Sequence, residues 1–486
     1  MKSFLLPILI FIVFSCPLMG QKLHDKIPFA HLLKDLELLE RNLRKVHPGL
    51  HTYHSPRSMD SIFKKYRSMI SRDMTSMEFY QKVGTLINLI GDAHTEIEPN
   101  EAFYDSLNTR WKVFPLSTVW LDKRLFVIED FSDEKLSLKG KEIVAINGVS
   151  SNEIFRHIRQ YVPRDGYNLT SPNHTLSGIF GQFRNYYASI YGHPESFNVV
   201  VRDNGKNEKN ISVRGLKYRR IFDKYDNANT PKKPSQEPLQ FTIQEGVGIL
   251  KVRSFHPGQI REAGQNFKKF FKRTFKQIFE QGVQQLVIDI RKNGGGHESV
   301  FMELFSHLTD KPFFAYKELS TVTVSVPDKE YYLEQDEISY LERWSKKNLK
   351  KIGSKYYSLN EAGTRKVIPN KNAFSGNLMV LIDGRTSSAA GDFSGLIKSY
   401  DRATFIGEET GGNPYENNAG TRLTLVLPYS GLQIIIPTLK YVINYNKKND
   451  GRGVYPDHKV NLTIEDLLGN RDKTLGMALK LLKEQR

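Results

Sequence analysis

The chain has 486 residues, of which 39% are hydrophobic and 11% aromatic, and it carries a formal net charge of +17. This length and apolar content exclude a wholly disordered chain and allow two or three domains with their own cores. The charge is compatible with an anionic partner or with solubility alone. The densest basic run, residues 268–276, alternates with phenylalanines as an amphipathic helix does, which favours a solvated face over a nucleic-acid track.

The N-terminus has the pattern of a signal peptide. Lys2 supplies the positive charge, and the apolar run over residues 4–14 is too short to span a bilayer. We therefore expect residues 1–20 to be a signal peptide and the mature chain to be exported to the periplasm or cell envelope. Cys16, the only cysteine, loosely resembles a lipoprotein acylation site, and cleavage after Gly20 is the simpler alternative. In both cases the mature chain has no internal disulfide.

Residues 21–100 are predicted to form a helical domain. Leucines recur at helical spacing from residue 32 to residue 43, and a second helical run follows a turn. Thr75 and Glu78 form a capping-box signature for a third helix, which should end at Gly91. His94 follows at a corner from helix to strand. A histidine there can face a cleft, although a lone histidine is more often structural.

Three histidines, His47, His51 and His54, lie in the segment H-P-G-L-H-T-Y-H. Their spacing is superficially that of a metal site. Pro48 and Gly49 disrupt helical geometry, however, and no carboxylate accompanies the histidines. We therefore predict no metal site.

Residues 101–223 are predicted to be rich in β-strands. The segment 140–150 reads as strand, turn and strand, with Asn147 and Gly148 in the turn. It resembles the strand pair of PDZ-like modules, which bind extended peptide ends by strand addition, and a plain hairpin is the alternative. Residues 224–238, rich in Pro, Lys, Asn and Ser, are predicted to be a linker.

From residue 239 onward the pattern predicts a parallel α/β fold. Buried strands are expected at residues 247–252, 285–290 and 378–382, with a helix over 263–279. Three glycines, residues 294–296, follow the second strand and expose N–H groups of the kind that an oxyanion hole needs. Their spacing matches neither the dinucleotide fingerprint nor the Walker pattern.

Two serines, Ser387 and Ser388, follow the third strand where the chain turns into a helix. The N-terminus of a helix favours developing negative charge, which suits an acyl-transfer nucleophile. The alternative is that these serines only cap the helix. Because parallel sheets place their sites at the carboxyl ends of strands, the serine turn and the glycine turn should share one edge.

Five segments together resemble the motifs of the tail-specific, or carboxyl-terminal processing, serine peptidases and their tricorn-core relatives. They are D-I-R-K-N-G-G-G (289–296), S-S-A-A (387–390), I-G-E-E-T-G-G (406–412), G-V-Y-P-D (453–457) and G-D-A-H-T (91–95). The specificity lies in the combination of motifs. The resemblance implies a crotonase-like α/β peptidase core over residues 239–486, with a PDZ-like β-rich domain and an N-terminal helical domain.

Carried over by position, the resemblance assigns the nucleophile to Ser388. The oxyanion donors fall on the N–H of Ala389 and on that of Gly295 or Gly296. The glutamate of the family's S-A-x-E motif falls on Gly391, which is a departure from the pattern.

The resemblance also bears on the base. The basic lysine of the Ser/Lys type falls on Asn413, whereas the histidine of the tricorn-like branch falls on His94. The relay serine of that branch falls on Ala93, so the orienting group is open, and Asp450 is a weak candidate. Lys398 lies about three helical turns beyond the serine, too far to act as its base.

The sequence thus predicts an exported serine endopeptidase that cleaves peptides or protein C-terminal regions through an acyl-enzyme, without a cofactor. Its expected partners are peptides or unfolded proteins and not nucleic acid. The missing lysine and relay serine leave an alternative, an inactive protein that binds peptides or apolar ligands on the same fold.

Overall fold

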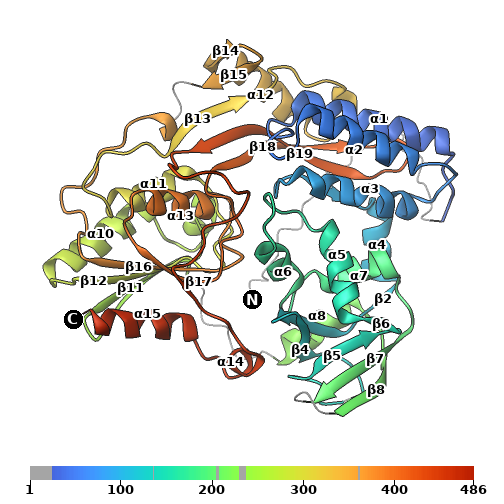
Figure 1. The fold of residues 1–486 in the computed structure, drawn as a ribbon, viewed down its shortest axis with the longest axis horizontal. Coiled ribbons are helices and arrows are strands. Elements are labelled where there is room, and N and C mark those ends of the chain that lie inside the picture. The colour runs from blue at the N-terminus through green and yellow to red at the C-terminus, as the bar shows by residue number, and fades with distance from the viewer. Residues whose placement is uncertain (1–23, 135, 204–206, 229–236, 359–361, 486) are drawn as a thin grey trace.

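The computed structural model describes residues 24–134, 136–203, 207–228, 237–358 and 362–485 (Figure 1). The predicted signal peptide and Cys16 lie outside these residues. Within them, no helix has both the length and the apolar character needed to cross a membrane.

The chain begins with three helices around the β18–β19 hairpin, at the upper right of Figure 1: α1 (Phe29–Val46), α2 (Pro56–Ser68) and α3 (Ser76–Ile90). The leucines at helical spacing on α1 are buried, as predicted. The capping box of Thr75 and Glu78 is present, and Gly91 ends α3 with a left-handed φ of 75°.

An antiparallel sheet joins this helical part to the C-terminal half. Its strands, in the order β1-β19-β13-β15-β14 with β18 beside β19, are β1 (Glu96–Glu98), β13 (Tyr316–Thr321), β14 (Leu349–Ile352), β15 (Lys355–Ser358), β18 (Glu416–Val426) and β19 (Gln433–Ile443). Helix α12 (Gln335–Asn348) precedes β14. Because β1 pairs with β19, the corner that carries His94 is held against a strand more than 300 residues away in the sequence.

The middle of the chain forms an antiparallel sheet, at the lower right of Figure 1, in the order β3-β4-β5-β7-β8 with β6 beside β5. The strands are β3 (Leu116–Leu121), β4 (Arg124–Asp130), β5 (Glu142–Ile146), β6 (Val149–Ser150), β7 (Ser196–Asp203) and β8 (Asn207–Arg214), and β2 (Lys112–Val113) pairs with β9 (Leu216–Lys217). The helices are α4 (Glu101–Thr109), α5 (Ser151–Ile158), α6 (Thr170–Leu176), α7 (Phe183–Tyr191) and α8 (Tyr218–Ala228). The predicted turn is confirmed, because Asn147 and Gly148 join β5 to β6 with φ values of 50° and 80°.

The predicted linker, residues 224–238, is wrong at its start. Helix α8 continues through residue 228, and Lys224 donates hydrogen bonds to the carbonyls of Phe131 and Ser132. Residues 224–228 therefore belong to a helix held on the β-rich region. Residues 229–236 lie outside the described part.

The C-terminal half contains the predicted parallel sheet, in the order β10-β11-β12-β16-β17-β20, in which only the pair β10–β11 is antiparallel. Its strands are β10 (Leu239–Gln244), β11 (Val247–Val252), β12 (Gln285–Asp289), β16 (Asn377–Ile382), β17 (Thr404–Gly407) and β20 (His458–Lys459). The helices are α9 (Pro257–Glu262), α10 (Phe267–Glu280), α11 (Glu298–Ser306), α13 (Ala389–Ser399), α14 (Ile464–Leu468) and α15 (Lys473–Glu484). The single helix expected over 263–279 is wrong at its start, because Gly264, with φ 74°, separates α9 from α10.

Helices cover both faces of this parallel sheet. Alternate residues of β16 pack either with α10, α11 and α13 or with α15, and Figure 1 shows α15 on the opposite side from the other three. The sheet is therefore buried on both faces, which explains the continuous apolar runs in its strands. The loops after β12, β16 and β17 leave the same edge, where the candidate site lies.

Candidate active site

Ser388 stands in a strained turn between β16 and α13. Its backbone has φ 52° and ψ −131°, in a region that costs a non-glycine residue about 1–3 kcal/mol. Its hydroxyl makes no capping hydrogen bond to the helix. The turn therefore presents the Ser388 side chain without using it to complete the helix, and surrounding contacts must stabilise the strained backbone.

Two loops hold this turn. The N–H of Ser387 donates to the carbonyl of Asn293 at 3.1 Å, and the N–H of Gly412 donates to the carbonyl of Thr386 at 3.0 Å. A Cβ on Gly391 would lie 2.9 Å from the Cα of Gly412, closer than such atoms approach. The position of the family's glutamate is therefore occupied by glycine because the loop leaves no space for a side chain.

His94 lies in the corner between α3 and β1, beside Ser388. Its Nε2 is 3.2 Å from the Ser388 Oγ, across 294 residues of sequence. The side chain is largely buried, with 16% of its surface exposed. The structure thus brings together the two residues that the sequence singled out for nucleophile and base.

The carboxylate beside His94 is Asp92, not Asp450. Asp92 Oδ1 lies 3.8 Å from His94 Nδ1 and accepts the main-chain N–H of His94 at 3.2 Å. Asp450 is exposed, and its Oδ1 accepts the N–H of Arg452. The prediction of Asp450 is therefore corrected. His94 Nδ1 has no hydrogen-bond partner among the described residues, so at 3.8 Å Asp92 acts on the ring through its charge.

Asp92 is buried and ionised. His47 Nε2 lies 3.0 Å from its Oδ2, and Thr95 Oγ1 donates to the same oxygen at 2.5 Å. Burial by itself raises the pKa of Asp92, but the hydrogen bonds and charges of His47 and His94 outweigh it and hold the pKa well below its usual range. The N–H of Gly49 donates to His47 Nδ1, which leaves His47 Nε2 as the nitrogen that faces Asp92.

These contacts also explain the histidine-rich segment. His47 supports Asp92, and His54 Nε2 lies 2.8 Å from the carbonyl of Leu89. No group of three or more His, Cys, Asp or Glu side chains that could hold a metal ion occurs within the described ranges.

The net effect of the environment on His94 is to raise its pKa. Burial alone lowers this pKa, but the negative charges of Asp92 and, farther away, Asp165 reverse the change. The ring therefore stays protonated to a higher pH than a free imidazole. Any reaction that needs neutral His94 should require a correspondingly higher pH.

Asp165 is a buried carboxylate that sequence reasoning missed. Its Oδ1 accepts the N–H of Ala93 at 2.9 Å, and its Oδ2 accepts the N–H of Asn413 at 3.1 Å. Burial and the charge of Asp92 raise its pKa to about 6. Asp165 thus ties the His94 corner to the loop after β17. The P-R-D-G sequence around it signals a turn but not these partners.

Asn413, at the position of the family's lysine, is buried and fully engaged. Its Nδ2 donates to the Tyr53 hydroxyl at 2.6 Å, and its Oδ1 accepts the N–H of Tyr415 at 2.8 Å. Lys398, the other lysine considered from the sequence, forms an ion pair with Asp457 at 2.5 Å. Neither position supplies a base to Ser388.

The candidate oxyanion donors are now distinguishable. The N–H of Gly295 donates to Asn293 Oδ1 at 2.9 Å, so it is already used. The N–H groups of Ala389 and Gly296 have no acceptor in the part of the chain that the structure describes. A Cβ on Gly295 would lie 2.7 Å from the Ser388 Cβ, so the glycine loop lies directly against the serine turn. Of the two predicted glycines, Gly296 keeps a free donor.

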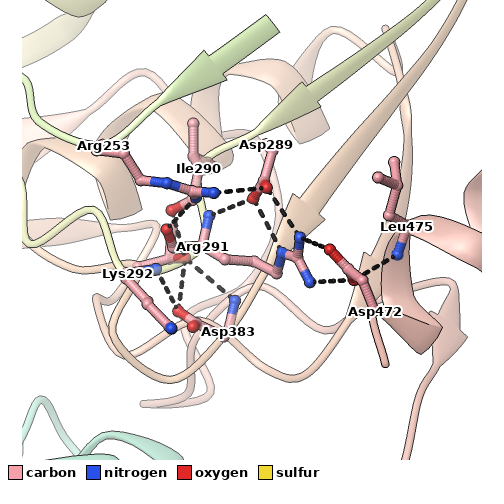
Figure 2. Close-up of polar contacts among 9 residues, drawn as sticks. Arg253, Asp289, Ile290, Arg291, Lys292, Asp383, Asp472 and Leu475 are labelled. Carbon is pink, nitrogen blue, oxygen red and sulfur yellow. Dashed lines mark hydrogen bonds and ion pairs between the residues drawn. The ribbon is translucent and has the colours of Figure 1, made fainter. Parts of the chain in front are cut away.

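The start of the glycine loop is fixed by the charged network of Figure 2. Buried Asp289 accepts hydrogen bonds from Arg291 and Arg253, and Arg291 also pairs with Asp472 at the start of α15. Burial raises the pKa of Asp289, but the two arginines outweigh it and lower the pKa to about 2. Lys292 N–H donates to Asp383 Oδ1 at 2.9 Å, which joins the ends of β12 and β16. The sequence motif pointed to this segment but not to the network.

The β-rich region reaches the same edge through α6. His174 Nε2 lies 2.5 Å from Glu408 Oε2, and the Asn168 amide donates to Glu409 Oε1 at 3.0 Å. A Cβ on Gly384 would lie 2.8 Å from the carbonyl of Thr170, so α6 packs closely on the serine turn. The site therefore depends on three separate parts of the chain.

Comparisons with known proteins bear on the family and the fold of the chain. Residues 246–460 match the model of Peptidase family S41, a range that includes Ser388 and the glycine loop, whereas His94 lies upstream of it. The fold is similar to that of mature CPAF complexed with lactacystin, with a TM-score of 0.59 and 14% identity over 93% of this chain and 97% of that chain. It is also similar to mature CPAF, with a TM-score of 0.57 and 14% identity over 90% and 94% of the two chains.

Proposed function

Because residues 246–460 match the model of Peptidase family S41, we propose that this chain is a serine peptidase, with Ser388 as its nucleophile and His94 as its general base. The proposal rests on one observation above all, the 3.2 Å separation of His94 Nε2 and Ser388 Oγ at the edge where the glycine loop ends. The strained backbone of Ser388 adds to it, because such strain clusters at functional sites.

In the proposed reaction, Ser388 Oγ attacks the carbonyl carbon of a peptide bond, and its proton passes to His94 Nε2. The resulting oxyanion would accept hydrogen bonds from the N–H groups of Ala389 and Gly296. His94 then returns the proton to the leaving amine as the C–N bond breaks, which leaves an acyl-enzyme. Water attacks the ester with the same base, releases the acid and restores Ser388.

Asp92 would act on His94 rather than on substrate. Its ionised carboxylate, 3.8 Å from Nδ1, favours the imidazolium that forms when Nε2 takes the serine proton. Contacts between a catalytic histidine and its carboxylate are often too long for a hydrogen bond without substrate, and they tighten in the reacting complex. Asp92 is therefore the proposed orienting group in place of the absent relay serine.

The finer features of the proposal concern substrate and location. The β5–β6 hairpin and its neighbours support a PDZ-like role for residues 101–223 in holding an extended peptide, so that the enzyme would cleave peptides or protein C-terminal regions. The histidine base favours the tricorn-like branch of the family. Export to the periplasm or envelope, with acylation of Cys16 as one form, rests on the pattern of residues 1–20.

The test compares Ser388→Ala with the matched variant Ser387→Ala on an unfolded protein substrate. Ser388→Ala should lower turnover by at least about three orders of magnitude, because the acyl-enzyme can no longer form. Ser387→Ala should retain most activity, and both variants should melt near the wild-type temperature. Equal activity of Ser388→Ala and wild type would refute the assignment, and loss in Ser387→Ala alone would move the nucleophile by one residue.

A further inference from the structure

A second site lies behind the histidine corner, on the far side of His47 from Asp92. A cavity of about 690 Å³ opens between the end of α1, the turn over residues 47–52 and the β14–β15 hairpin. We call it the basic cavity; its polar lining includes Lys45, His51, Thr52, Ser354, Lys355 and Lys440. Its volume falls in the range of small-molecule sites, about 300–1,000 Å³.

The charged side chains that line the basic cavity are all positive. Four of the lining residues are lysine or arginine, and no described carboxylate lines the cavity. Arg44 is neutralised by Glu40 and Asp60, and Lys440 pairs with Glu416 at 2.7 Å. The side chains of Lys45 and Lys355 form no ion pair or hydrogen bond with any residue that the structure describes. The charge of Lys45 acts on Asp328, but both oxygens of Asp328 are already held by Arg41.

Local structure explains only part of this charge. Lys45 lies in the last turn of α1, where a cation complements the helix dipole without any ligand. That account does not apply to Lys355, which begins β15, or to Lys440, which comes from the middle of β19. Lys440 has its counter-charge in Glu416, so the like charges of Lys45 and Lys355, from two separate elements, remain without a paired carboxylate at one cavity. Such an arrangement lowers stability unless an anion balances it.

The chemistry of the lining selects the kind of anion. Lysines are common phosphate ligands that act as point charges, and the several acceptor oxygens of one phosphate group can take donors from more than one lysine and hydroxyl. The hydroxyl of Thr52 already accepts from Lys440 at 3.1 Å and can still donate outward, and Ser354 adds another hydroxyl at the hairpin turn. We propose that the basic cavity binds a small molecule or lipid headgroup through its phosphate group. The segment H-P-G-L-H-T, which the peptidase site uses only through His47, would form one wall.

The binding test uses the full-length mature chain and two probes, inorganic pyrophosphate by calorimetry and vesicles of phosphatidic acid in phosphatidylcholine by co-sedimentation. The double variant Lys45→Gln/Lys355→Gln should weaken the binding by roughly tenfold or more, because two charge-assisted contacts are lost. The matched control, Lys268→Gln/Lys272→Gln, removes the same charge from the exposed face of α10 and should change the affinity by less than about twofold.

Each outcome decides the proposal. Saturable pyrophosphate binding that needs the two lysines supports a soluble phosphate ligand, and vesicle binding with the same dependence, but no pyrophosphate binding, supports a lipid headgroup. If neither pyrophosphate nor the vesicles bound, or if the α10 control variant bound as weakly as Lys45→Gln/Lys355→Gln, the proposed phosphate site would be wrong. The Ser388→Ala variant should bind like wild type, so the result does not depend on the peptidase assignment.

Discussion

Ser388 carries the strained backbone of the site, and the residues around it explain why the turn persists. Gly295 and Gly412 lie directly against it, and a Cβ at either position would meet the serine turn at 3.0 Å or less. Close backbone packing thus adds to the side-chain hydrogen bonds of Asp383 and Thr386 that hold the turn. Small additions of volume should therefore affect the nucleophile.

Gly391→Ala tests this packing. The added methyl would lie 2.9 Å from the Gly412 Cα, so we expect a loss of about 1–3 kcal/mol in unfolding free energy and a fall in turnover as the loop shifts. The control is Gly476→Ala on α15, where nothing lies within 4 Å, and which should stabilise the protein by about 0.5–1 kcal/mol. Denaturant unfolding and peptide hydrolysis measure both. A neutral Gly391→Ala would show that the loop is not tightly packed.

The pH dependence of activity tests the role of Asp92. Only neutral His94 can accept a proton, and its pKa is raised, so kcat/KM should rise with pH through a value above the ordinary 6.5. Asp92→Asn removes the charge that raises this pKa while burial still lowers it, so the acidic limb should move to lower pH. His94→Gln should lower turnover by roughly two to four orders of magnitude.

The matched control for that profile is Asp450→Asn. Asp450 is exposed and bonded to Arg452, so its loss should leave the acidic limb in place. Asp165 and Asp392, a buried residue of α13, have pKa values raised to about 6 and about 7, so both also titrate near neutral pH. The test therefore compares the shift of the acidic limb of the pH profile between variant and wild type, and not the pH at which that limb lies. If the acidic limb of the pH profile shifted in Asp450→Asn and not in Asp92→Asn, Asp450 and not Asp92 would be the acid that acts on His94.

For individual residues, the sequence predicted that Ser388 and His94 lie close together, but it did not predict the carboxylates that contact the histidine corner. The motifs place the serine at a strand end and the histidine at a helix end, and both properties are local. Asp92 was overlooked although it is only two residues from His94, because the family pattern directs attention to a distant acid. Asp165 could not be found, since its partners Ala93 and Asn413 come from opposite ends of the chain.

At the scale of elements, the Asp289 network joins β12, the glycine loop and α15 (Figure 2). The Asp289 side chain is 1% exposed and is held by two arginines. Removing one partner of such a buried pair leaves the other charges uncompensated. The glycine loop should therefore lose its fixed position when the network is broken.

Asp289→Asn should lower the unfolding free energy at pH 7 by about 3–5 kcal/mol. The folded-state pKa of about 2 is below the ordinary 3.8, so the carboxylate stabilises the fold above pH 3.8 and this contribution is lost as pH falls through about 2. The difference in unfolding free energy between Asp289→Asn and wild type should accordingly become smaller as the pH falls from 4 to 2. Asp472→Asn, which removes a half-exposed partner of Arg291 and keeps a capping side chain, should cost about 1 kcal/mol or less. If Asp289→Asn and Asp472→Asn lowered the unfolding free energy equally, the buried Asp289 would contribute no more to stability than the half-exposed Asp472.

Strands were easier to predict than the segments between them. The run 378–382 is buried on both faces, so its apolar residues are continuous and its limits are clear. The predicted linker over 224–238 shows the reverse, because its first residues, 224–228, are polar and yet lie in α8. The break at Gly264 was hidden by helical periodicity on both of its sides.

At the scale of the whole molecule, the candidate site exists only when distant parts of the chain meet. His94 follows α3, Asp165 precedes α6, and Ser388 follows β16, so three regions contribute to one edge. The parallel α/β core could be predicted because its pattern is local to each strand and helix. The packing of the helical and β-rich regions against this core could not be predicted, because contacts such as that between His174 and Glu408 leave no pattern in the sequence.

Labelling of the purified protein with a serine-directed fluorophosphonate, followed by mass spectrometry of the modified peptide, tests the assignment of Ser388 and His94. We expect one modified residue, Ser388, with labelling that increases with pH as His94 loses its proton and that is strongly reduced in His94→Gln. An unmodified protein, a label on another serine, or labelling of Ser388 that is unaffected by the loss of His94 would contradict this assignment.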